Sequence, residues 1–256
     1  MSARIETSPS HANRIGNVAA PGTPGIHRHP RHAVVIASGG LDSTVLAYWL
    51  QARGTQLTLL SFDYGQRHRV ELRFAAATAQ ALGTRHEVVD LSALGRVLQG
   101  SALTDSGVGV PDGHYTDETM RATVVPNRNA IMLDIAVALA VTTQADAVAF
   151  GAHAGDHPIY PDCRERFTTS FARTAQVANE GFLTDDFQLV VPFLASSKTD
   201  IVRLGAALNV PFEQTWSCYR GGTEHCGRCG TCTERREAFH AAGVTDPTTY
   251  AVQECG

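Results

Sequence analysis

The apolar residues of this chain follow two alternating patterns, short runs typical of buried strands and longer stretches with helical spacing. The first of the short runs, at 34–36, consists of β-branched residues and is followed by glycines, which favours a buried strand. The short runs predict strands near 34–36, 55–62, 85–89, 145–150 and 188–191, and the helical spacing predicts helices near 43–50, 70–82, 128–143, 164–179 and 198–208. Alternating strands and helices are joined by right-handed crossovers, which give a parallel sheet covered on both faces. The predicted fold class is therefore α/β, with three layers in the order α/β/α.

The first predicted strand ends at two glycines that lie just before a predicted helix. Gly39 and Gly40 allow a sharp turn and let the backbone approach a ligand closely. Unpaired amide groups of the helix's first turn would point into this bend and attract an anion, of which phosphate is the expected one. No Gly-Lys-Ser/Thr follows, so the stretch is not a Walker A loop. Taken alone, it would also fit an ordinary turn in which Asp42 or Ser43 caps the helix.

The complete hexapeptide S-G-G-L-D-S resembles the pyrophosphate loop (PP-loop) of the N-type ATP pyrophosphatases. These enzymes split ATP into AMP and pyrophosphate while activating a carboxylate, an amide or a related group. The resemblance implies a Rossmann-like sheet of the adenine nucleotide alpha-hydrolase type, with ATP as co-substrate and Mg2+. The residues that it assigns to ATP binding are Ser38, Gly39, Gly40, Leu41, Asp42 and Ser43.

Composition and charge narrow the class of protein. With 256 residues and 43% apolar content, the chain can form one sizeable α/β domain. The formal net charge of -4 gives no electrostatic footprint for nucleic acid. No apolar run approaches membrane-spanning length and no signal peptide is recognisable, so we expect a cytoplasmic protein without a membrane partner. Residues 1–32 are rich in Ser, Pro, Gly and His and are expected to form a disordered leader.

Polar clusters follow several predicted strands, at the sheet edge where ligands of such folds bind. They occupy 63–68, 125–129 and 151–164, although the first would also fit an ordinary turn and Asn127 could simply cap a helix. The connection 98–124 is long and rich in glycine, which indicates either a lid over the substrate or a surface loop of no catalytic role.

Four cysteines near the C-terminus follow the spacing C-x7-C-x2-C-x2-C. Four thiolates with no free position are typical of a structural zinc site. An iron-sulfur cluster or free thiols are the alternatives. The ligands would be Cys218, Cys226, Cys229 and Cys232. We therefore predict a nucleotide-binding domain at 33–215 and a zinc-binding, helical C-terminal module at 216–256.

Six stretches together resemble the 7-cyano-7-deazaguanine synthase family, over about 33–239. They are S-G-G-L-D-S, D-Y-G-Q-R-H, P-D-G-H-Y, V-V-P-N-R-N, Y-P-D-C-R and T-W-S-C-Y with the cysteines that follow. The resemblance implies a carbon-nitrogen ligase that turns 7-carboxy-7-deazaguanine, ATP and ammonia into a nitrile through an adenylate and an amide. It also implies one structural zinc per chain rather than a cluster, and a homodimer. The chain departs from the family at Ile159, where glycine is common, and in its leader.

The resemblance also assigns roles to individual residues. Asp42 and Lys198 would be catalytic, with Lys198 neutralising phosphates, although a lysine at a helix start more often points to solvent. The residues implied in substrate binding are Arg67, Arg128, Tyr160, Asp162 and Arg164. The rival functions are another PP-loop enzyme, such as a tRNA thiolase or a defence-associated relative that attaches a deazaguanine to a macromolecule, and a non-enzymatic zinc module.

Overall fold

A single parallel sheet forms the centre of the protein, shown here by a computed structural model that describes residues 28–114 and 116–251. Its strands are β1 (His32–Ile36), β2 (Gln56–Asp63), β3 (Arg85–Asp90), β4 (Ala147–Ala149) and β5 (Gln188–Val190). The strand order is β3-β2-β1-β4-β5, and every neighbouring pair is parallel. The chain moves from β1 to β2 on one side and returns to β4 on the other, so the topological switch point lies at the carboxyl end of β1.

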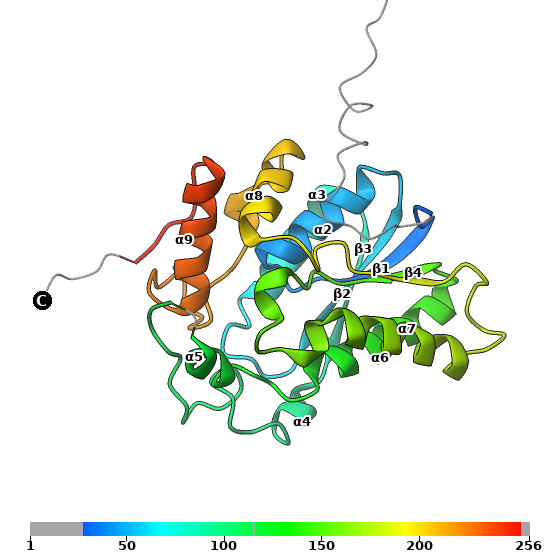
Figure 1. Cartoon of the computed structure of the whole chain (residues 1–256), viewed down its shortest axis with the longest axis horizontal. Coiled ribbons are helices and arrows are strands. Elements are labelled where there is room, and N and C mark those ends of the chain that lie inside the picture. The colour runs from blue at the N-terminus through cyan, green and yellow to red at the C-terminus, as the bar shows by residue number, and fades with distance from the viewer. Residues whose placement is uncertain (1–27, 115, 252–256) are drawn as a thin grey trace, which may run out of the picture.

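Helices cover both faces of this sheet, which confirms the predicted α/β class and its layer order (Figure 1). One face carries α2 (Leu41–Gln51), α3 (Glu71–Leu82) and α8 (Lys198–Ala207), and the other carries α6 (Arg128–Thr143) and α7 (Glu165–Ala178). Ala33 and Val35 of β1 pack under the first layer, whereas Val34 between them packs under the second. This alternation follows from the two-residue period of a strand.

The elements begin and end close to their predicted limits, with one clear exception. The predicted strand 145–150 is reduced to β4, although the backbone N–H of Asp146 still donates to the carbonyl of His32 at 3.1 Å. The buried carboxylate of Asp146 also accepts the backbone N–H groups of Arg31 (3.0 Å) and His32 (2.8 Å). The same contacts hold the start of the described chain, where Arg28 also pairs with Asp186 at 2.7 Å. Residues 28–32 therefore belong to the folded part, which makes the predicted leader of 1–32 too long at its C-terminal end; residues 1–27 lie outside the described residues.

The connection 98–124 packs against the protein rather than looping freely over its surface. Ala102, Leu103 and Val110 are buried, and Asp112 forms a β-bridge with Cys229. A short helix, α4 (Ser92–Gly95), precedes this connection, and another, α5 (Asp117–Arg121), lies within it. The segment thus joins the sheet domain to the C-terminal cysteines, and Met120 within it lines the candidate active site.

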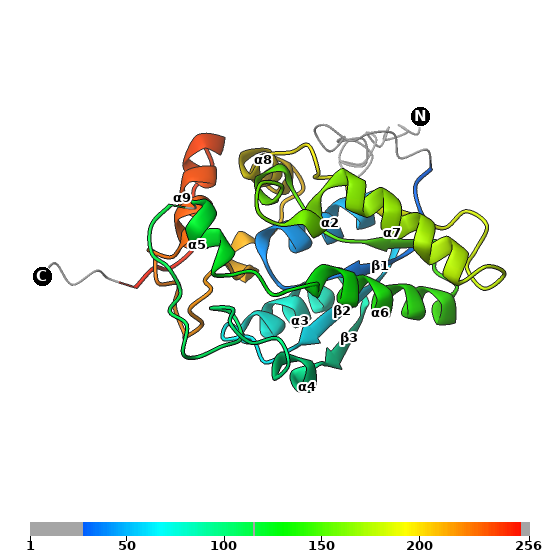
Figure 2. The same cartoon turned by 60° about the horizontal axis from the view of Figure 1, so that its bottom comes forward.

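The C-terminal module continues from the sheet domain through helix α9 (Gly230–Ala242), which lies beside α8 (Figures 1 and 2). Arg235 of α9 is fully buried and donates to Thr215 Oγ1 (2.7 Å) and to the carbonyl of Phe212 (3.1 Å), while pairing with Asp246 at 3.2 Å. Phe239 packs edge-to-face on Phe212 with ring centroids 4.9 Å apart. Single-turn 3-10 helices complete the described chain, namely η1 (Ala154–Asp156), η2 (Pro161–Cys163) and η3 (Phe212–Gln214). Among the described residues, none of the helices has the length and apolar character needed to span a bilayer.

Candidate functional site

The glycine turn between β1 and α2 is built tightly against the start of α3. Gly39 has a φ of 75°, and a Cβ there would lie 2.2 Å from the carbonyl oxygen of Glu71, so no other residue fits. Helix α2 begins immediately after Gly40, and no side chain caps it. Asp42 and Ser43 therefore are not N-caps, and the unpaired amides of the first turn remain available to an anion.

Two adjoining cavities open at this turn, at the carboxyl ends of the strands. The apolar lobe, of about 220 Å3, is lined by Ile36, Phe62, Met132 and Phe150 together with Arg128. The phosphate-loop lobe, of about 140 Å3, is lined by Gly40, Leu41, Lys198 and Glu234. The residues common to both are Ser38, Asp42, His68, Glu71, Asp156, Tyr160 and Tyr219. The two lobes are thus parts of one site that meet beside the turn.

Lys198 points into this site and not into solvent. Its ammonium lies 2.6 Å from Asp42 Oδ2, 3.5 Å from Glu234 Oε2 and 3.3 Å from His153 Nε2, and only 15% of the side chain is exposed. Ser197 caps the helix in its place, accepting the backbone N–H of Asp200 at 3.2 Å. The lysine is thereby directed across the carboxyl edge of the sheet toward the glycine turn.

The pair formed by Lys198 and Asp42 is held in its charged form. Burial alone would raise the pKa of Asp42, but the Lys198 ammonium and the nearby His153 outweigh it and hold that pKa below its usual value. Burial likewise opposes charge on Lys198, yet Asp42 and Glu234 raise its pKa overall. The second carboxylate oxygen of Asp42, Oδ1, is buried without a hydrogen-bond partner among the described residues. It is therefore an unused ligand aimed into the site.

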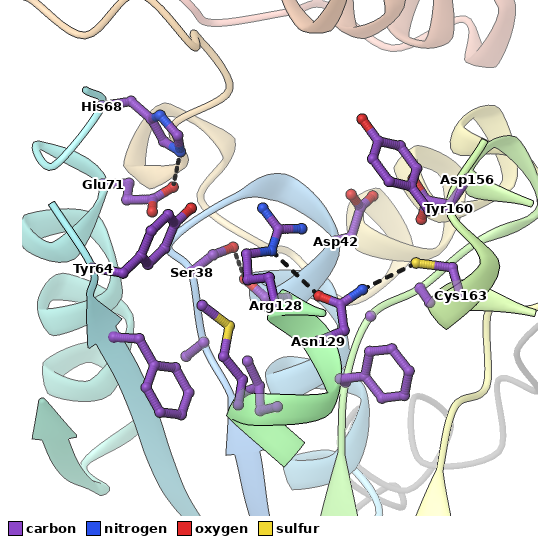
Figure 3. A pocket seen from close by; sticks show the side chains of 18 of the residues that line it. Ser38, Asp42, Tyr64, His68, Glu71, Arg128, Asn129, Asp156, Tyr160 and Cys163 are labelled. Carbon is purple, nitrogen blue, oxygen red and sulfur yellow. Dashed lines mark hydrogen bonds and ion pairs between the residues drawn. The ribbon is translucent and has the colours of Figure 1, made fainter. Parts of the chain in front are cut away.

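Of the five residues that the family resemblance implied in substrate binding, two line the lobes. Arg128 begins α6, hydrogen-bonds Tyr64, and has no carboxylate within 4.0 Å among the described residues. Tyr160 lies opposite, with its hydroxyl 2.7 Å from Thr123 Oγ1. Figure 3 shows Arg128 between a wall carrying Tyr64 and a wall carrying Tyr160. A guanidinium without an acidic partner suits an anionic ligand.

The other three residues line neither lobe and hold loops. Arg67 donates to the carbonyls of Asp105 (2.9 Å) and Val108 (3.0 Å). Arg164 donates to the carbonyls of His157 (2.7 Å) and Pro158 (3.0 Å). Asp162 accepts the backbone N–H of Asn129 at 3.3 Å. The charged groups of these three side chains are hydrogen-bonded to backbone atoms of nearby segments. The sequence motifs alone do not reveal these bonds.

Several polar residues of the site were not assigned a role from the sequence. His68 and Glu71 are buried, with 4% and 8% exposure, and Glu71 Oε2 lies 3.4 Å from His68 Nε2. His153 accepts the backbone N–H of Gly155 at 3.0 Å, and Asp156 accepts that of His153 at 3.0 Å. The two histidines and Asp156 fall within the polar clusters predicted at the strand ends, so the sequence did indicate that they lie near the site. No sequence pattern indicated Glu234, because only the packing of α9 beside α8 brings it to Lys198.

The four cysteines come together beside this site. The sulfur atoms of Cys218, Cys226, Cys229 and Cys232 all lie within 4.8 Å of one another. Tetrahedral thiolates about 2.3 Å from one zinc ion stand roughly 3.8 Å apart, so this spacing fits a single ion. A 4Fe-4S cluster would place its irons between the sulfurs and spread them further. The group can therefore hold one metal ion.

The cysteine loop is hydrogen-bonded to the glycine turn. The backbone N–H of Trp216 donates to the carbonyl of Gly39 at 2.8 Å, and its indole N–H donates to the carbonyl of Cys218 at 2.7 Å. The Trp216 ring also lies 5.4 Å from Phe74 of α3 and 4.2 Å from His225. One tryptophan thus links the metal-binding group to the turn that would hold phosphate.

Comparison with known proteins places this arrangement in a family. The family model described as "Queuosine biosynthesis protein QueC" matches residues 32–243. Relatives named 7-cyano-7-deazaguanine synthase, from Sinorhizobium fredii and Rhizobium meliloti, are 60% and 59% identical over 217 residues, covering 85% of this chain and 91% of each relative. The solved U34-tRNA thiolase NcsA from Methanococcus maripaludis, with its 4Fe-4S cluster, is 14% identical with a TM-score of 0.49, covering 96% of this chain and 82% of that chain, a likeness too remote to bear on function. The chain belongs to the QueC family of queuosine biosynthesis proteins.

Proposed function

We propose that this protein is an ATP-dependent carbon-nitrogen ligase that converts 7-carboxy-7-deazaguanine and ammonia into 7-cyano-7-deazaguanine. The observation that carries the proposal is the identity of 60% with a synthase of that name over 91% of its length. The site supports the same conclusion independently, because an anion-binding turn, a charged lysine and a two-lobed cavity meet at one point. One lobe would hold the deazaguanine ring and the other the nucleotide, which would bring the substrate carboxylate to the α-phosphorus of ATP.

The chemistry proceeds by two activations in the same site. A carboxylate oxygen of the substrate attacks the α-phosphorus, pyrophosphate leaves, and ammonia then displaces AMP to give the amide. The amide oxygen attacks the α-phosphorus of a second ATP, pyrophosphate leaves again, and loss of AMP together with two protons of the amide nitrogen then gives the nitrile. The protein contributes positioning and charge stabilisation, so the reaction needs no nucleophilic Ser or Cys. Cys163 lines the apolar lobe, and burial raises the pKa of its thiol, which suits a passive role.

The turn and the lysine divide the phosphate charge between them. The amides of Gly40 to Ser43 would bind the triphosphate, and Lys198 would release Asp42 to neutralise the departing pyrophosphate. Asp42, whose Oδ1 is unpaired, would hold Mg2+ with help from Asp156 or Glu234 in the same lobe. When bound, the ion supplies neutralisation of phosphate oxygens. Zinc at the four cysteines would be structural, since all its positions are taken by protein sulfur.

The assembly stays a prediction from the family resemblance. We expect a homodimer, which light scattering of the purified protein tests directly. A monomer over the working concentration range would contradict it.

The amide is the substrate that tests the proposed function most directly. The sequence carries one S-G-G-x-D-S loop, so a single site must activate both the acid and the amide. Supplying 7-amido-7-deazaguanine with ATP and no ammonia should give the nitrile with one AMP per product, against two from the acid, as measured by chromatography and mass spectrometry. A protein that stops at the amide would contradict the proposed function, and amide conversion that survives Asp42→Ala would show that a second site activates the amide.

Arg128 is expected to discriminate between these two substrates. The acid carries a charge and the amide does not, so Arg128→Gln should raise the KM for the acid by roughly 10- to 100-fold, the range of a charge-assisted hydrogen bond. The KM for the amide should change much less. Arg173→Gln is the matched control, because Arg173 is exposed on α7 and lines neither lobe. Equal increases for both substrates would assign Arg128 to the nucleotide instead.

A further inference from the structure

The proposed reaction places a demand on the site that the phosphate-binding residues do not meet. The nitrogen that enters as ammonia loses one proton when the amide forms and two more when the amide becomes the nitrile. All three leave from the same atom, bonded to the same carbon. A base must therefore stand where that carbon reacts, which is where the two lobes meet beside the glycine turn.

Among the residues shared by both lobes, two buried side-chain atoms have no hydrogen-bond partner within the described chain. One is Asp42 Oδ1, beside Lys198, and the other is His68 Nδ1. A buried polar atom without a protein partner costs free energy unless a ligand or an ordered water completes it, and such atoms recur at catalytic sites. Asp42 suits a cation, whereas an imidazole nitrogen suits an N–H group. His68 is therefore the candidate for the proton acceptor.

The surroundings of His68 fix its orientation. Its Nε2 faces Glu71 Oε2 at 3.4 Å, and its ring lies against Tyr219 with centroids 5.3 Å apart. Glu71 is held in turn by Gln66, whose Nε2 donates to Glu71 Oε1 at 3.1 Å and to the carbonyl of Phe62 at 2.9 Å. Figure 3 shows His68 and Glu71 together on the wall that also carries Tyr64. With Nε2–H directed at Glu71, the lone pair of Nδ1 has no partner among the described residues, in a side chain that lines both lobes.

We propose that His68, oriented by Glu71, is the base that removes the protons of the incoming ammonia and of the amide. This assignment rests on the proposed function. In the first step the carbon-nitrogen bond forms, the bond from carbon to AMP oxygen breaks with its electron pair, and an N–H proton passes to His68 Nδ1. The Nε2 proton moves to the Glu71 carboxylate. In the second activation the two remaining N–H protons leave by the same route while AMP departs, with release to solvent between them.

The charges around the pair suit this role. Burial raises the pKa of Glu71 to about 8, although Gln66 and Arg128 partly oppose the shift. Burial, reinforced by Arg128, lowers the pKa of His68 to about 3, so the imidazole stays neutral. The groups that face the pair are Arg128 from α6, Tyr64 at the end of β2, and Tyr219 and Cys229 from the C-terminal module. The pair therefore accepts a proton, which ends on Glu71, with an affinity near working pH, as an efficient base requires.

Two half-reactions separate a base from a residue that binds ATP. Exchange of pyrophosphate into ATP, driven by the acid without ammonia, reports adenylation and involves no N–H proton. In Glu71→Gln and His68→Asn, this exchange should stay within about threefold of wild type, while conversion of the amide to the nitrile should fall by roughly 10²- to 10⁴-fold. His86→Asn is the matched control, because His86 contacts Ser61 Oγ at 2.8 Å and lines neither lobe; both half-reactions should keep their wild-type rates.

The possible results separate the role of His68 from the proposed ligase function on which it rests. The assignment of His68 as the base would be wrong if exchange and amide conversion fell together in both variants. It would also be wrong if amide conversion were unchanged in both. Absence of both half-reactions in the wild-type protein would instead reject the proposed function, and this assignment with it. Should the variants fail to fold, the wild-type pH profile decides. The amide conversion rate should rise with pH and level off above about 8, because below that pH Glu71 already carries a proton. A flat profile from pH 6 to 9 would contradict the proposal.

Discussion

Lys198→Ala should reduce acid-dependent pyrophosphate release by roughly 10³-fold, the upper range for removing one preorganised stabilising group from a transition state. The lysine lies 2.6 Å from Asp42 and at the edge of the glycine turn, so it is the cation placed to follow charge onto the leaving pyrophosphate. Asp42→Ala should have a comparable effect through loss of the cation site. Both side chains line the cavity rather than the apolar core, so the fold should survive.

Arg203→Ala provides the control for this experiment. Arg203 lies on the same helix as Lys198, is 56% exposed and pairs with Asp200 at 3.5 Å, so its loss should leave pyrophosphate release unchanged. Circular dichroism and a melting curve verify that each variant is folded. Pyrophosphate release at the wild-type rate in Lys198→Ala would show that the phosphates bind elsewhere.

Lys198 can also be probed without mutation, because it is the only lysine of the chain. An amine-acylating reagent can therefore modify one side chain, and ATP with Mg2+ should protect it if the ammonium contacts phosphate. Mass spectrometry of the peptide that contains Lys198 measures the protection, with the acid substrate alone as the comparison. Equal labelling with and without ATP would separate Lys198 from the nucleotide.

The parts of the fold that the sequence predicted are those set by local pattern. The run of helical apolar spacing at 128–143 coincides with α6, and short apolar runs between turn residues placed all five strands. The glycine turn was also predictable, since its geometry depends on Gly39 and Gly40 and on the helix that follows. Local pattern does not include the shape of the surrounding packing, so the exclusion of a Cβ at Gly39 by the carbonyl of Glu71 was visible only in three dimensions.

The parts of the site that escaped prediction depend on contacts between distant segments. Arg67 and Arg164 have the charge of substrate ligands, yet backbone carbonyls of nearby loops use it. Glu234 reaches Lys198 only because Arg235, the next residue of α9, is buried under the Phe212 segment and fixes the helix. His68 and Glu71 are three residues apart at the start of α3, but their value lies in burial at the junction of two lobes.

Loss of the metal should weaken ATP binding as well as the fold. Trp216 donates one N–H to the carbonyl of Gly39 and another to the carbonyl of Cys218, so this residue connects the cysteine loop to the glycine turn. Structural zinc contributes roughly 10 kcal/mol or more in small domains, as much as the whole net stability of a typical protein. Cys229→Ser should therefore lower the melting temperature by about 10 °C or more and reduce ATP affinity in the fraction that stays folded.

The measurement compares three properties of the same preparations: metal content, melting temperature and ATP affinity by calorimetry. Cys255→Ser is the control, since that cysteine does not belong to the C-x7-C-x2-C-x2-C spacing and its loss should change none of them. Because Trp216 connects the cysteine group to the glycine turn, chelation of the metal from the wild-type protein should reduce metal content and ATP affinity in parallel. One zinc per chain is the expected content, and iron with inorganic sulfide would instead support a cluster. A metal-free protein that melts at the wild-type temperature and binds ATP normally would show that the cysteines do not support the phosphate turn.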